Sequence, residues 1–456
     1  MDSRFERDLS KGNITKQLLR FAWPFILSNM IQALYNVADM IIVGNFCGAE
    51  SMSGVNIGGQ VTFLLTNIVI GLSVGGTVLI GQFKGRNDKV AMRELVGTLL
   101  TTLFFLGLVM TVVMISIRKP ILHLIKTPEE SFDQANAYLI ITTLGTLFIF
   151  GYNALSAIMR GMGDSKHPMM FVGIACVTNI ILDLILVGAY GMRAQGAALA
   201  TIFSQAMSMF LCILYMKRHD FIFDFKLSSF RFYGNRLKML LKVGIPTSVQ
   251  NVITNVSFLF ITALVNTFGV DASAAVGAAG KVNSFAILPA IAMSSAVSAM
   301  AAQNIGAGKI DRAKQTMRIG MLMAVIMSWS VFAIVQLFPE QVLRLFADDD
   351  GMITLGVSYL RIMSVDYLIV PFLFCLNGLN IGSGHTKFSL INNVMSALLF
   401  RIPFSYIFGM ALDWGLPGVG LGAPSATIAA LCVAIWFYFT GRWQTQVVFD
   451  DAPVTE

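Results

Sequence analysis

The stretch LVGTLLTTLFFLGLVMTVVMISI, residues 95–117, contains no charged side chain. It is long enough to cross a bilayer as a helix, which takes about 20 apolar residues. Of all 456 residues, 56% are hydrophobic and only 12% are charged, and the mean hydropathy is +0.72. Soluble domains carry about 25% charged residues, and a soluble protein of this size could not bury so much apolar surface. The sequence therefore predicts an all-α membrane protein.

Similar apolar runs recur along the whole chain and predict twelve transmembrane helices. The expected spans lie near 18–43, 54–80, 95–117, 137–159, 169–190, 196–216, 240–267, 275–301, 316–338, 357–380, 388–412 and 421–441.

The basic residues indicate which loops face the cytoplasm. Of the 32 Lys and Arg, 24 fall in the terminal segments and every second loop, whereas the opposite loops hold five. By the positive-inside rule, both termini and the long linker at 217–239 are expected in the cytoplasm, in a protein of the plasma membrane. The net charge of +7 is thus a topology signal and a contact with anionic lipid of the bilayer. It does not predict a nucleic-acid partner.

The two halves of the chain share short motifs at a nearly fixed offset. Gln82-x-x-Gly85 in the first half recurs as Gln303-x-x-Gly306 in the second. The other matches are Gly163 and Lys166 with Gly384 and Lys387, Asn45 and Gly48 with Asn266 and Gly269, Pro24 with Pro246, and Gly196 and Thr201 with Gly422 and Thr427. Each half has six spans, an even number, so the halves enter the membrane from the same side as a parallel repeat.

This repeat predicts two six-helix lobes. We expect an N-terminal lobe (1–216), a cytoplasmic linker (217–239) and a C-terminal lobe with a short tail (240–456). Parallel repeats of this kind place the substrate between the lobes and permit alternating access.

Three acids lie well inside the expected spans: Asp39, Asp183 and Asp366. An ionised side chain at a helix centre costs about 2.5–3.5 kcal/mol on insertion scales, and such residues mark ion or proton paths. Asp39 continues a polar helical face, and Asp183 follows Asn179 by one turn. Protonation or sodium binding would neutralise the acid pair.

A purely structural role, in which these acids only bond neighbouring helices, is the alternative. This structural alternative is strongest for Asp366, whose repeat counterpart is Gly145. The repeat counterpart of Asp39 is Phe260, so the second half keeps the scaffold without that acid. The scaffold alone therefore does not require it.

Several motifs together resemble the multidrug and toxic compound extrusion (MATE) family over residues 12–441. They are Pro24, Leu34-Tyr-Asn-Val-Ala-Asp39 with Gly44, Gly81-Gln-x-x-Gly85, Arg160-Gly-x-Gly-Asp164 and Gly196-Ala-Ala-x-Ala-Thr201. The resemblance implies a V-shaped pair of lobes that exports organic cations against an inward flow of protons or sodium ions. Asp39, Asn179 and Asp183 resemble the cation site of the DinF-like branch, Thr201 a hydroxyl near it, and Pro24 a proline associated with bending of the first helix.

The expected function is therefore ion-coupled export of small amphipathic cations, as in multidrug resistance, by a protein that works as a monomer. Either protons or sodium ions fit as the coupling ion, and no cofactor is expected. The candidate residues for the substrate cavity are Gln32, Tyr35, Asn36, Asn251, Thr254, Asn255 and Asp366.

Two other functions are alternatives to export. A flippase for a lipid-linked precursor would need a basic cavity, for which Lys281 and Arg401 are candidates. A membrane enzyme is not expected, because the sequence offers no nucleophile–base pair or metal cluster. The sequence has no GxxxxGK[ST] motif, so ATP is not the expected energy source.

Overall fold

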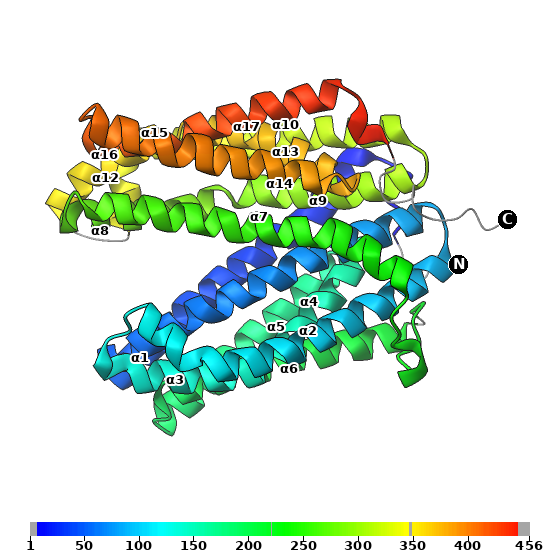
Figure 1. Ribbon diagram of the computed structural model, residues 1–456, viewed down its shortest axis with the longest axis horizontal. Helices are drawn as coiled ribbons and strands as arrows, with labels where there is room; N and C mark the ends of the chain where they lie inside the picture. The colour runs from blue at the N-terminus through cyan, green and yellow to red at the C-terminus, as the bar shows by residue number, and fades with distance from the viewer. Residues whose placement is uncertain (1–6, 220, 346–348, 446–456) are drawn as a thin grey trace. The chain divides into compact units, whose positions relative to one another are not determined.

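The computed structural model describes residues 7–219, 221–345 and 349–445. Within these ranges the regular structure is entirely helical (Figure 1), so the predicted all-α fold class is confirmed. Residues 1–6 of the expected N-terminal lobe, Arg4 among them, and residues 446–456 of the expected tail lie outside the described ranges.

The helices follow the expected spans in order. The first half of the chain forms α1 (Ile14–Gly85), α2 (Lys89–Leu124), α3 (Glu129–Leu144), α4 (Thr146–Gly161), α5 (Lys166–Asp183), η1 (Leu184–Ala189), α6 (Arg193–Arg218) and η2 (Leu227–Ser229). The second half forms α7 (Gly234–Asn266), α8 (Val270–Ala286), α9 (Leu288–Gly306), α10 (Ile310–Leu337), α11 (Pro339–Arg344), α12 (Asp350–Met363), α13 (Asp366–Gly382), α14 (Thr386–Met395), η3 (Ser396–Arg401), α15 (Ile402–Tyr406), η4 (Ile407–Ala411), α16 (Gly415–Gly420), α17 (Gly422–Phe439) and η5 (Arg442–Gln444).

Among the described residues, nine helices are long and apolar enough to cross a membrane. The number rises to 11 when two bent pairs, α3 with α4 at 51° and α12 with α13 at 43°, each form one span. The long helix α1 contributes two spans, because its backbone leaves helical geometry at Gly48 (φ 77°, ψ −178°). Counting α1 as two spans gives the twelve that the sequence predicts.

The connection between the first two spans differs from expectation. The sequence suggests a gap at 44–53, yet the chain stays helical up to Gly48 and again after it. A glycine adopts positive φ at little steric cost, so this single residue is enough to redirect the chain.

The internal repeat is visible in the backbone. The repeat counterparts Gly48 and Gly269 have φ of 77° and 101°. Gly163 and Gly384, which correspond at the same offset, have φ of 89° and 91°. Each half of the chain therefore turns at the same positions with the same left-handed glycines.

The chain divides into two compact units, and two helices, α1 and α7, each contribute to both of them. Unit 1 includes Trp23–Ser248, and unit 2 includes Leu9–Ala22 together with the chain from Val249 onward. Helix α1 therefore begins in unit 2 and continues in unit 1, whereas α7 does the reverse. Pro24 and Pro246, repeat counterparts within these helices, each lie within two residues of the change of unit.

Within unit 1, the start of α7 packs very closely on the second span of α1. A Cβ atom on Gly71 would lie 2.2 Å from Ser248 Oγ, and one on Gly75 would lie 3.0 Å from Gly244 Cα. The Ser248 hydroxyl donates to the carbonyl of Ile68 at 2.7 Å. Small residues permit this approach, as is common between membrane helices.

We expect Gly71→Leu to destabilise unit 1, because the new side chain would overlap the α7 backbone. Overpacking of a close contact costs about 1–3 kcal/mol or more. The measurement is the thermal unfolding midpoint of the detergent-purified protein. Gly59→Leu is the matched control, since Gly59 lies in the same span and a Cβ there meets nothing within 4 Å. Equal midpoints for the two variants would contradict this account of the packing.

Candidate functional site

The two acids predicted in the first lobe come together in unit 1. Asp39 lies in the first span of α1 with 7% exposure, and Asp183 is the last residue of α5 with none. Their carboxyl groups face each other within hydrogen-bonding reach. The π-helix η1 begins directly after Asp183, and π-turns within helices frequently occur at functional sites.

Asn179 fixes the position of Asp183. With its amide oriented to satisfy the hydrogen bonds around it, Asn179 donates to Asp183 Oδ2 at 2.9 Å. Its amide oxygen accepts from the backbone N–H of Thr201 at 3.2 Å. Asn179 is fully buried, so it links α5 to α6 at the level of the acid pair.

Hydroxyl groups line the other side of the pair. Tyr35, one turn before Asp39 on α1, shares a 2.9 Å hydrogen bond with Thr201 Oγ1. Tyr138 of α3 is buried, lies within hydrogen-bonding reach of the Thr201 hydroxyl, and interacts electrostatically with both acids. Four helices therefore contribute polar groups to one small region of unit 1.

Both acids keep unused oxygen atoms. Oδ1 of Asp39 and Oδ1 of Asp183 are buried and have no hydrogen-bond partner among the residues described. Within the same ranges, no basic side chain is among the groups that act on the two carboxyls. Two facing carboxylates repel each other unless a proton or a metal cation lies between them. The oxygen-rich surroundings suit either a proton or a hard cation such as sodium.

Tyr138 is a site residue that the sequence analysis missed. A signal for it exists, because Tyr359 stands at the equivalent position of the second half. Only the fold shows that the α3 tyrosine faces α1.

The remaining candidates belong partly to unit 1 and partly to unit 2. On α1, Gln32 and Asn36 are exposed and Pro24 is buried. On α7, Asn255 donates to the carbonyl of Asn251 at 2.8 Å, and the Thr254 hydroxyl donates to Asn393 Oδ1 at 3.2 Å. Asp366 is the first residue of α13 and interacts with Thr427. The roles of all these residues in substrate binding stay predictions.

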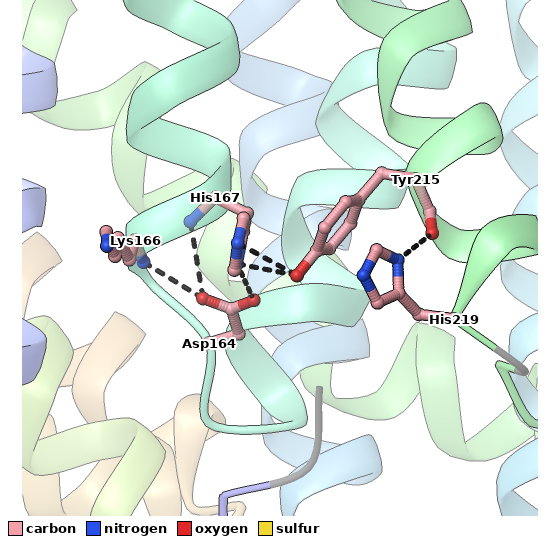
Figure 2. A network of polar contacts seen from close by, with 5 residues as sticks. All are labelled: Asp164, Lys166, His167, Tyr215 and His219. Carbon is pink, nitrogen blue, oxygen red and sulfur yellow. Dashed lines mark hydrogen bonds and ion pairs between the residues drawn. The ribbon is translucent and has the colours of Figure 1, made fainter. Parts of the chain in front are cut away.

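A separate polar network explains the motif around Asp164. Figure 2 shows its carboxylate accepting from the backbone N–H groups of Lys166 and His167, at 3.1 and 3.2 Å. The same carboxylate contacts His167 Nδ1 at 2.5 Å, and Tyr215 of α6 contacts His167 Nε2 at 2.8 Å. His219 Nδ1 donates to the Tyr215 carbonyl at 2.9 Å. This network holds the α4–α5 turn against the end of α6.

A model of the MatE family matches residues 24–185 and 246–407, one match in each half. The chain is 29% identical to the "Probable multidrug resistance protein YpnP" of Bacillus subtilis, over 97% of this chain and 99% of that protein. It is 26% identical to the "Probable multidrug resistance protein NorM" of Thermotoga maritima, over 97% and 96%.

Among solved structures, the chain resembles a MOP superfamily transporter from Pyrococcus furiosus. The TM-score is 0.89 at 25% identity, with 97% of this chain and 98% of that chain covered. The likeness therefore extends over the whole chain and both repeats.

We expect Asn179→Ala to lower stability by about 1–3 kcal/mol, because it removes the donor to Asp183 and the acceptor of the Thr201 N–H. The thermal unfolding midpoint of the purified protein measures the effect. Asn153→Ala is the control, since Asn153 donates only to the carbonyl of Ile149 in its own helix. A loss no larger than that of the control would show that Asn179 does not hold the acid pair.

Proposed function

The chain belongs to the MatE family, and on that premise we propose that it exports amphipathic organic cations in exchange for protons or sodium ions by alternating access. Membership makes it a multi-pass membrane transporter of the multidrug efflux type rather than an enzyme. The coupling ion, its site and the substrates belong to the proposal.

The observation that carries the proposal is the acid pair of unit 1. Asp39 and Asp183 face each other, and an oxygen of each is buried without a partner among the described residues. Burying a charged group without compensation costs several kcal/mol. A pair of acids in a membrane helix bundle is therefore stable only while it carries a positive partner, and an exchangeable cation is such a partner.

The surroundings of the pair suit a cation that binds and leaves. The amide N–H of Asn179 donates to Asp183, and Thr201 brings a hydroxyl oxygen. Tyr35 and Tyr138 bring hydroxyl groups that can donate to the bare carboxylates. The same site can thus hold both charge states of the acids. Inward movement of one cation supplies about 2.3 kcal/mol per 100 mV of membrane potential.

Cation binding at this site can affect the bending of α1. Asp39 lies on the same helix as Pro24, and a proline within a helix removes a backbone hydrogen bond and eases bending. We propose that the charge of the acid pair biases the bend at Pro24, and that the organic cation leaves as the coupling cation enters.

The flippase alternative has less support. Lys281 is exposed on α8, whereas Arg401 lies over the Phe258 ring at 4.9 Å and interacts electrostatically with Asp366. Because Arg401 already stacks on an aromatic ring, it is less available to a pyrophosphate headgroup.

The placement of the protein in the cell is also part of the proposal. The basic loops support a plasma-membrane location with both termini in the cytoplasm. We propose that the single chain is the working unit and that it needs no cofactor beyond the coupling ion.

We expect Asp39→Asn to abolish ion-driven efflux of a cationic dye from proteoliposomes while the protein still folds. The amide keeps the shape of the side chain but cannot exchange a proton or balance a sodium ion. Proton and sodium gradients are imposed separately, so that the same experiment identifies the coupling ion. Glu50→Gln is the control, because Glu50 is an exposed acid of α1. Normal efflux by Asp39→Asn would remove this residue from the mechanism.

We expect Tyr138→Phe to weaken coupling-ion affinity several-fold without loss of folding, because one hydrogen bond is worth about 1 kcal/mol. The ion concentration that gives half-maximal efflux measures the change. Tyr190→Phe serves as the control, since Tyr190 is 74% exposed. Identical half-maximal concentrations in the wild type and Tyr138→Phe would place Tyr138 outside the site.

A further inference from the structure

We propose that the segment 227–233, which leads from the first half of the chain into α7, lies in the headgroup region of the membrane. It inserts apolar side chains between the acyl chains and binds anionic lipid through Arg231. The partner is the leaflet on the side that the basic loops assign to the cytoplasm. The inference goes beyond the proposed function, because it involves neither the coupling ion nor the exported substrate.

The chain between α6 and α7 is a folded part of unit 1. Phe223 is buried, and its ring centroid lies 5.2 Å from that of Phe225 and 5.3 Å from that of Phe230. The short turn η2 lies between these rings in the sequence, and the chain then enters α7 (green in Figure 1). The position of the segment 227–233 is therefore fixed by its contacts with the rest of unit 1.

The segment is held against the beginning of the apolar stretch of α2. The Thr98 hydroxyl donates to the carbonyl of Arg231 at 3.5 Å and accepts from the backbone N–H of Tyr233 at 3.3 Å. The approach is closest at Gly97, where a Cβ atom would lie 2.5 Å from the carbonyl oxygen of Ser229. These contacts fix the height of the segment along α2.

That height is at the edge of the hydrocarbon layer. The uncharged stretch of α2 spans 95–117, so the contacts at Gly97 and Thr98 are within its first turn. Phe232 reaches further, because its ring centroid lies 5.6 Å from that of Phe105. Phe105 stands roughly three helical turns beyond residue 95. The segment is therefore level with lipid.

The protein leaves the apolar side chains of the segment uncovered. Leu227 is 93% exposed, half of Phe232 is exposed, and Phe230 is exposed as well. The contact of Phe232 with Phe105 joins this patch to the exposed apolar side chains of α2, which include Phe104, Phe105, Val109 and Val112. Aromatic and apolar groups at such a boundary are typical of contact with the membrane interface. The patch therefore continues the lipid-facing surface of α2.

Exposed arginines accompany the apolar patch. Arg231 belongs to the segment, and Arg93 of α2 directly precedes the uncharged stretch. The Arg93 Nε donates to the carbonyl of Ile222 at 3.0 Å, which holds this side chain at the same boundary. A long basic side chain at this level keeps its stem among apolar groups and extends its charge to the headgroup phosphates. Lys226 contributes less, because Asp224 pairs with it at 3.8 Å.

The test inserts the photoreactive amino acid p-benzoylphenylalanine at single positions of the full-length protein. The protein is placed in nanodiscs with equal amounts of phosphatidylcholine and phosphatidylglycerol, and mass spectrometry identifies what is attached after illumination. We expect lipid at the positions of Leu227 and Phe232, with phosphatidylglycerol captured several-fold more often at Leu227. Val112, exposed within the uncharged stretch, is the reference for lipid, and Lys89, the exposed first residue of α2, is the reference for water.

The charge of Arg231 is tested in the same nanodiscs. We expect Arg231→Gln to lower the preference for phosphatidylglycerol at the Leu227 position by about twofold or more, because basic groups near the surface attract anionic lipid. Arg231→Lys should keep most of the preference. Arg193→Gln is the matched control, since Arg193 is an exposed arginine that the sequence assigns to the opposite side of the membrane. Asp39→Asn should give the same attachments as the wild type, so the result is independent of transport.

Three results would overturn the inference. Absence of lipid at the Leu227 and Phe232 positions, when the Val112 position captures it, would place the segment in water. Attachment to a second copy of the chain would make the patch an interface between copies. Equal capture of the two lipids by the wild type would remove the role of Arg231. A loss of ion-driven efflux, by contrast, bears on the proposed function alone.

Discussion

A charge inside a membrane helix must be compensated by something nearby, and the chemistry of this protein depends on that constraint. Water is not available to solvate such a charge, so the partner must be another side chain, a proton or an ion. In unit 1, no basic side chain is among the described groups that act on the buried acids Asp39 and Asp183. In unit 2 a single acid, Asp366, stands at the bend between α12 and α13. On the proposed function, the acid pair of unit 1 therefore needs a mobile partner.

The helices around these sites are interrupted where the sites lie. The π-helix η1 follows Asp183, and η3 ends at Arg401. Asp366 stands at the bend between α12 and α13. Interruptions of this kind free backbone groups and change the direction of side chains, which regular helices do not allow. Asp183, Asp366 and Arg401 therefore lie at irregular turns in an otherwise regular bundle.

Much of this architecture can be predicted from the sequence, because apolar length, loop charge and repeated motifs are local signals. The number of spans and the parallel repeat follow from them, and buried acids are conspicuous in apolar runs. The contact between α3 and α1 that brings Tyr138 to Asp39 is different. It depends on how helices far apart in the chain pack. The residues next to a tyrosine in a membrane span do not indicate which residue of another helix it contacts. The single-residue break at Gly48 was also hidden, since one glycine among helical residues gives no sign of its backbone angle.

The matching glycines bear on the history of the chain. Gly48 and Gly269 share a left-handed backbone, as do Gly163 and Gly384, so these turns were in place before the ancestral half was copied. The acids, by contrast, occupy different positions in the two copies. Divergence after duplication therefore acted on side-chain charge and left the path of the backbone intact, so that one inherited scaffold carries acids at different positions in its two copies.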